Sequence, residues 1–127
     1  MPWLWREVGN PAANEVVVDI KGARTQDRVF NVYGLYICHN ATSAKRYAVR
    51  TFREGTNETA HFFTVLVPAG SLPFVLDSDE PLVAGVGAFT GDYWEHFRIV
   101  AVDGGEPTLS IGVRIKGRWY AETGMRG

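Results

Sequence analysis

Apolar and polar residues alternate with a period of two along most of this chain, and this alternation constrains the fold more than any other feature. Successive side chains of a β-strand point to opposite faces, so the period predicts strands with one buried face. The 14 glycines and 6 prolines fall mainly between the apolar runs, where they mark turns. The pattern predicts eight strands, over residues 15–20, 28–38, 45–53, 61–67, 73–76, 82–88, 93–102 and 108–120.

The number and spacing of these strands indicate the fold class. Many short strands joined by turns, with no long helical period between them, are typical of an all-β sandwich or jelly roll. A chain of 127 residues, 46% of them hydrophobic, can bury one core without a metal or disulfides. We therefore expect a single antiparallel, jelly-roll-like β-sandwich over residues 12–120. An N-terminal aromatic arm over 1–11 and a short polar tail over 121–127 would flank it.

Two strands have a clear division between an inner and an outer face. In 45–53 the alternation places Tyr47, Val49 and Thr51 inside, and in 108–120 it places the aliphatic residues inside. The outer faces of both strands are basic, and they carry Arg46, Arg50, Arg114, Lys116 and Arg118. A formal net charge of -1 disfavours nucleic acid as the partner of this basic stripe. A solvated face or an acidic protein surface fits better.

Two other strands are apolar on both faces, although a sandwich strand needs only one buried face. On one face of each strand lie Tyr33, Leu35 and Ile37, and Phe62 and Leu66. We expect a subunit interface to cover this second face, which would make the protein a homo-oligomer, either a dimer or a trimer. Loops or the N-terminal segment of the same chain would cover it equally well.

The N-terminal segment begins with Trp3, Leu4 and Trp5 and shows no alternation that would place it in the same core. Tryptophan is costly to leave in water and is common among binding anchors. The segment is therefore expected either to dock on a neighbouring protein or to fold back over its own sandwich.

Few residues in the sequence point to catalysis. The histidines His39, His61 and His96 lack the spacing of a metal-binding motif, and Cys38 and His39 should point to opposite faces of their strand. We therefore expect no enzyme, no metal and no cofactor. The N-terminus resembles neither a signal peptide nor a membrane span, so we expect synthesis in a cytoplasm and no contact with a membrane.

Three segments together resemble small β-sandwich virion proteins of tailed bacteriophages. They read VFNVYGLYICHNATSAKRYAVRTFREG, FFTVLVPAGSLPFVLDSDEPLVAGVGAF and LSIGVRIKGRWY, within residues 28–120. The resemblance implies a capsid decoration or cement protein that resides in the virion and stabilises the head. Its partner would be the lattice of the major capsid protein or another virion protein. The aromatic arm has no counterpart in this pattern.

Two alternatives remain open from the sequence. The chain is also compatible with a tail, fibre or head-completion component. The other alternative is that the chain is a carbohydrate-binding module, in which Tyr93, Trp94, Trp119 or Tyr120 would stack on sugar rings.

Overall fold

The computed structural model describes residues 3–22, 29–87, 95–121 and 125, with the side chains of residues 120 and 121 left undescribed. These residues form ten strands in two sheets. The strands are β1 (Trp3–Val8), β2 (Glu15–Lys21), β3 (Phe30–His39), β4 (Lys45–Arg53), β5 (Glu58–Val67), β6 (Phe74–Asp77), β7 (Val83–Val86), β8 (His96–Ala101), β9 (Leu109–Gly117) and β10 (Tyr120–Ala121). Within the described ranges, no helix has the length and apolar character needed to cross a bilayer.

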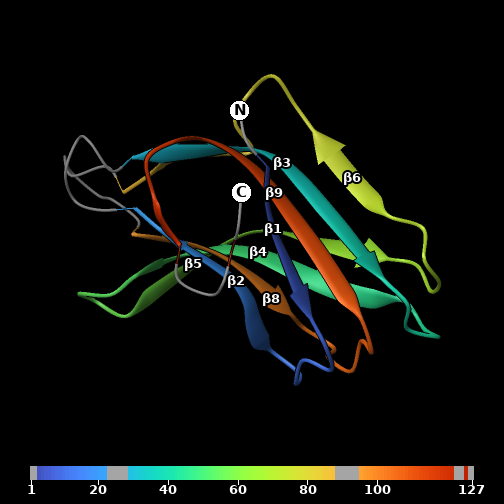
Figure 1. Cartoon of the computed structure of the whole chain (residues 1–127). Coiled ribbons are helices and arrows are strands. Elements are labelled where there is room, and N and C mark those ends of the chain that lie inside the picture. The colour runs from blue at the N-terminus through green and yellow to red at the C-terminus, as the bar shows by residue number, and fades with distance from the viewer. Residues whose placement is uncertain (1–2, 23–28, 88–94, 122–124, 126–127) are drawn as a thin grey trace.

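The two sheets pack face to face as a β-sandwich (Figure 1). In sheet A the strand order is β1-β9-β3-β6, and β7 pairs with the same edge of β3; in sheet B the order is β10-β2-β8-β4-β5. Every pairing is antiparallel, and strands near the N-terminus pair with strands near the C-terminus, as β1 does with β9 and β2 with β8. This order confirms the expected all-β, jelly-roll-like sandwich. It adds β1 and β10 to the eight strands that the alternation predicts.

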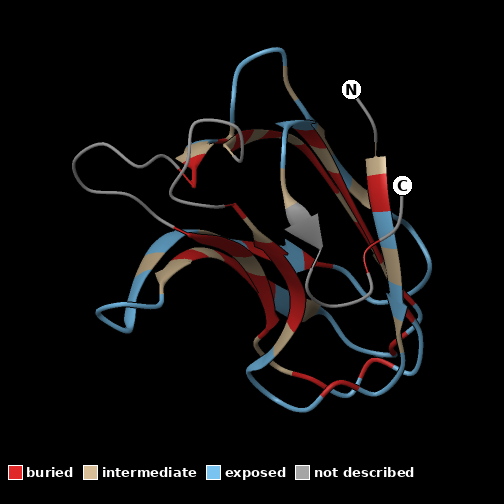
Figure 2. Cartoon of the chain, turned by 60° about the vertical axis from the view of Figure 1, so that its left-hand side comes forward, coloured by how far each residue is buried: buried red, intermediate tan, exposed pale blue. Residues whose placement is uncertain are grey.

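The core lies between the sheets and follows the predicted alternation in the clearest strands. Strand β4 has the bounds expected for 45–53, and its Tyr47, Val49 and Thr51 are buried. Alternate residues of β9, from Leu109 to Ile115, are fully buried. Figure 2 shows buried segments concentrated in the strands of both layers, whereas most connecting turns are exposed. Burial of these apolar side chains supplies the main favourable term in folding.

Leu35 and Ile37 of β3 were expected on a second apolar face outside the core. This expectation is wrong, because both residues lie in the core. Val32 pairs with Ile115 and Gly34 pairs with Arg114, so Tyr33 is an extra residue in β3 opposite β9. A β-bulge of one residue reverses which positions point inward. Phe30 and Val32 therefore face the core before the bulge, and Leu35 and Ile37 face it after the bulge.

The N-terminal segment folds back over its own sandwich, which was one of the two alternatives, but the expected separate arm is wrong because Trp3–Val8 is an edge strand of sheet A. All six of its residues pair with β9, and Leu4 is buried in the core with only 3% of its surface exposed. Trp3 and Trp5 lie on the outer face, so both faces of the strand begin with large apolar residues. This hides the period-two signal at the start of the chain.

The polar tail expected from residue 121 is also revised where the structure describes it. Tyr120–Ala121 forms β10, which pairs with Ile20 and Lys21 at the edge of sheet B. Met125 is buried in the hydrophobic core. The other residues of the expected tail lie outside the described part of the chain.

Candidate functional site

A row of side chains crosses the outer face of sheet A. Trp5 pairs with Gly112, Gly112 pairs with Tyr36, and Tyr36 pairs with Val75, so one row runs through β1, β9, β3 and β6. The Trp5 and Tyr36 rings meet edge to face, with their centroids 5.2 Å apart and an interplanar angle of 75°. The exposed fraction of Trp5 is 43%, and Val75 is also exposed.

Glycines in the neighbouring strands let the indole rings lie flat on the sheet. A Cβ on Gly112 would overlap the Trp5 ring, and a Cβ on Gly34 would overlap the Trp3 ring. The two indoles stack on each other at 5.5 Å and 22°. We call Trp3, Trp5 and Tyr36 the aromatic face. Because its rings are held by each other and by the sheet, binding on this face would order few side chains.

Polar groups flank the aromatic face on both sides. On one side, Arg114 Nε donates to Asp77 Oδ1 at 2.8 Å and Arg114 Nη2 donates to the carbonyl of Ser78 at 2.9 Å. The Arg114 guanidinium also lies 5.8 Å from the ring centroid of Tyr33. On the other side is a hollow of about 190 Å³ lined by Cys38, His39, Asn40, Ser71, Thr108 and Ser110.

The expected basic stripe is not continuous, which corrects the sequence interpretation. Arg46 and Arg50 lie on β4 in sheet B, whereas Arg114 and Lys116 lie on β9 in sheet A. The outer faces of the two sheets point away from each other, so these cations cannot form one surface. Arg46 instead pairs with Asp103 at 2.7 Å, which holds the pKa of that carboxyl below its usual range. Arg118 follows β9 and is exposed.

The remaining residues of the predicted interface divide between surface and core. Phe62 and Leu66 lie on β5, the edge strand of sheet B, and are 45% and 63% exposed. Tyr33 is half-buried at the bulge of β3. Leu4, Leu35 and Ile37 belong to the core and are therefore not available to a partner.

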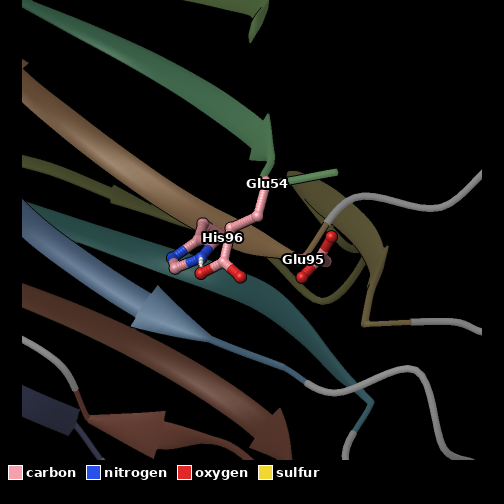
Figure 3. Close-up of side chains that lie close together, drawn as sticks. All are labelled: Glu54, Glu95 and His96. Carbon is pink, nitrogen blue, oxygen red and sulfur yellow. Dashed lines mark hydrogen bonds and ion pairs between the residues drawn. The ribbon is translucent and has the colours of Figure 1, made fainter. Parts of the chain in front are cut away.

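A second group of side chains lies on the outer side of sheet B, around His96 of β8. His96 Nδ1 is 2.6 Å from Asp19 Oδ1 of β2, and His96 Nε2 is 2.6 Å from Glu54 Oε1 in the turn between β4 and β5. Figure 3 shows the Glu54 carboxylate beside the His96 ring. Only 3% of His96 is exposed. Both ring nitrogens are engaged, so the imidazole in this arrangement has no nitrogen available as a general base.

The surroundings favour a protonated His96. Burial lowers the pKa of His96, but the hydrogen bonds with Asp19 and Glu54 outweigh this and raise it above its ordinary value. The hydrogen bonds from His96 and Lys21 hold the pKa of Glu54 below its usual range. Arg98 completes the group, because its Nε donates to Asp19 Oδ2 at 3.2 Å.

Glu95 lies beside this group and differs from its neighbours. Its side chain and those of Glu54 and His96 each place one possible ligand atom within 4.8 Å of the others (Figure 3). Glu95 is only 8% exposed, yet its carboxylate has no hydrogen bond or ion pair with the described part of the chain. We call Glu54, Glu95 and His96 the acidic histidine cluster.

Sequence reasoning missed the acidic histidine cluster. Its residues and Asp19 come from β2, the turn after β4 and the start of β8, and strand pairing alone brings them together. A single histidine with scattered acids has no spacing that a motif search could recognise. The adjacency of Glu95 and His96 is the one local signal, and on its own it is weak.

A further buried acid lies at the opposite end of the sandwich. Glu106 is fully buried, and neither of its oxygens nor the Tyr47 hydroxyl has a hydrogen-bond partner among the described residues. Burial raises the pKa of Glu106 above its usual range, and the neighbouring Tyr47 hydroxyl and the charges of Lys45 and His39 oppose this only in part. The pKa of Tyr47 is raised by burial and by the neighbouring Glu106.

The aromatic residues suggested for sugar stacking do not form the aromatic face. Trp119 is half-buried against the core. Tyr93, Trp94 and the side chain of Tyr120 lie outside the described residues. A sugar-binding surface on the described residues would therefore use Trp5 and Tyr36 instead.

Comparison with known proteins supports the fold and does not extend to function. No family model and no curated protein matches the chain. Among solved structures the chain is similar to "Crystal structure of PirA", with a TM-score of 0.54 and 11% sequence identity. The match covers 87% of this chain and 93% of the PirA chain. At this identity the likeness shows a shared β-sandwich fold alone.

Proposed function

We propose that this chain is a virion structural protein of the capsid decoration type, which binds the major capsid protein lattice through its aromatic face. The observation that favours this proposal most is the position of Trp5. Its indole is held against Gly112 and Tyr36, yet 43% of it remains exposed. Rigid, partly exposed tryptophans with polar groups around them have the properties of interface hot spots.

The energetics of attachment fit a molecule that acts by binding. A decoration protein stabilises a shell because it binds the assembled form and not the separated subunits. An aromatic face that is already ordered lowers the entropic cost of each contact. Arg114, Asp77 and the polar hollow would form the rim around the apolar centre of the interface.

The proposal is tested by the copy number of the chain on particles of the phage that carries its gene. Quantitative mass spectrometry of purified particles should find hundreds of copies, and the Trp5→Ser variant should have much lower occupancy. Glu15→Ser is the control, because Glu15 is an exposed residue of β2 in the other sheet and takes part in neither proposed contact. Absence of the chain from particles, or equal occupancy of Trp5→Ser and the unmodified chain, would refute this assignment.

Carbohydrate binding is a second candidate, and the hollow beside the aromatic face favours it. Ser71, Thr108 and Ser110 line this hollow and offer hydroxyl groups next to a flat aromatic surface. Sugars bind where a ring face stacks on an aromatic side chain and hydroxyls meet polar partners. A glycan array with Trp5→Ser as control separates the candidates, because a capsid decoration protein should give no saturable sugar signal.

Self-association remains part of the proposal, and β5 is the strand that favours it. Among the described strands, β5 lies at the edge of sheet B and pairs on one side only, and Phe62 and Leu66 stay exposed along it. A second copy that pairs with this edge would cover both residues. Sedimentation equilibrium should then detect a dimer or trimer, and Leu66→Lys should shift it to monomer. A monomeric unmodified chain at all concentrations would exclude self-association.

A further inference from the structure

We propose that the acidic histidine cluster binds one divalent transition-metal ion, with Zn²⁺ the best match to its ligands. One imidazole and two carboxylates supply nitrogen and oxygen donors of the kind found in zinc sites with three protein ligands and an open fourth position. Ca²⁺ and Mg²⁺ prefer oxygen ligands and therefore suit a site with a histidine ligand poorly.

The buried Glu95 carboxylate is the observation that points to a ligand. A glutamate of which only 8% is exposed normally has a partner for its carboxylate, because removal of that charge from water is costly. No described residue supplies one, although Lys21, Arg98 and His96 all lie nearby and bind the other acids of the group. A metal ion between Glu95, Glu54 and His96 would supply the missing partner.

Asp19 gives the site a typical second layer of contacts. Histidine ligands commonly donate their other ring N–H to a carboxylate, which fixes the ring and its tautomer. The 2.6 Å contact between His96 Nδ1 and Asp19 Oδ1 has this arrangement and leaves Nε2 toward Glu54. Arg98 in turn holds the second oxygen of Asp19.

Only a small rearrangement is needed to close the site. Ligand atoms around a tetrahedral zinc ion lie about 3.4 Å apart, given metal–ligand distances of about 2.0–2.2 Å. The present separations of up to 4.8 Å therefore require a contraction of up to about 1.4 Å, and the 2.6 Å contact between His96 Nε2 and Glu54 Oε1 must widen to admit the ion. Glu54 can provide it, because its side chain is 49% exposed in a turn. The ion replaces the proton on His96 Nε2, which passes to the solvent.

The proposal is tested by titration of the EDTA-treated full chain with ZnCl₂ in a calorimeter, and with Co²⁺ by visible absorption. We expect one ion per chain, and a loss of affinity of at least about tenfold in Glu95→Gln. This variant is informative because Glu95 takes part in none of the ion pairs of the group. Asp19→Asn should weaken binding about 10- to 100-fold without removing a ligand. Mg²⁺ should not compete.

Matched controls separate the cluster from other acids and histidines. Glu80→Gln removes an exposed acid and His61→Gln an exposed histidine, and both variants should bind Zn²⁺ as the unmodified chain does. Zn²⁺ should also raise the thermal unfolding midpoint of the unmodified chain more than that of Glu95→Gln. Absence of saturable binding, equal affinity in Glu95→Gln, or loss of binding in His61→Gln would overturn the proposal. None of these outcomes bears on attachment through the aromatic face.

Discussion

The indole of Trp5 lies directly on Gly112 of the neighbouring strand, at a point where no side chain beyond hydrogen fits beneath it. This contact joins the first strand of the chain to the strand that closes sheet A. It also sets the height of the aromatic face above the sheet.

Replacement of Gly112 by alanine tests this contact. The added Cβ would overlap the Trp5 ring, so the ring or β1 must move, and we expect a loss of about 1–3 kcal/mol in the free energy of unfolding. Urea denaturation followed by tryptophan fluorescence measures it. Gly55→Ala is the control, since a Cβ there meets nothing within 4 Å. Equal stability of the two variants would mean that Trp5 does not rest on Gly112.

Leu4→Ala tests whether the first strand belongs to the core. Leu4 is buried between the sheets, so its truncation should cost about 2–5 kcal/mol. Leu72→Ala, at a residue that is 77% exposed, should change the free energy of unfolding by no more than about 0.5 kcal/mol. Deletion of residues 1–8 should likewise destabilise the fold, because it removes Leu4 and exposes the edge of β9. A deletion variant as stable as the full chain would contradict this.

Ile37→Ala tests the reversal of faces at the bulge in β3. Because Ile37 points inward after Tyr33, its truncation should cost about 2–5 kcal/mol in chemical denaturation. Val75→Ala, on the exposed row of the same sheet, should cost less than about 0.5 kcal/mol. If instead Ile37→Ala behaved like a surface variant, the bulge would be misplaced.

Glu106 predicts a dependence of stability on pH. Burial raises its pKa in the folded state above the ordinary value of 4.5, so the folded chain retains a proton that the unfolded chain releases. The stabilisation linked to this proton is fully present below about pH 4.5 and is lost as the pH rises through the folded pKa. Glu106→Gln cannot ionise and should avoid this loss.

The urea midpoints of the unmodified chain and of Glu106→Gln, measured from about pH 4 to about pH 9, should therefore diverge as the pH rises. The Glu106→Gln variant should be the more stable protein at high pH. Glu58→Gln, at an exposed acid of β5, serves as the control and should follow the unmodified chain. Parallel midpoints for Glu106→Gln and the unmodified chain would show that Glu106 is not buried in its protonated form.

The strands and their inner faces can be predicted from the amino-acid sequence wherever the alternation runs unbroken. Strand β4 and its inward Tyr47, Val49 and Thr51 follow directly from a period of two, because that period is a property of the extended backbone. The same reasoning predicted that Cys38 and His39 point to opposite faces. His39 is buried beside the Val67 carbonyl, whereas Cys38 is only half-buried and its thiol lies beside the Ser71 carbonyl.

Features that depend on pairing between distant strands become visible only in the folded chain. The bulge at Tyr33 exists because β3 must fit β9, and one extra residue reverses which of Leu35 and Tyr36 is buried. Trp3–Val8 becomes a strand because β9 offers it an edge and two glycines leave room for its indoles. His96 meets Asp19 and Glu54 across 77 and 42 residues of chain. Sequence spacing contains no information about such contacts, since the register between strands sets them.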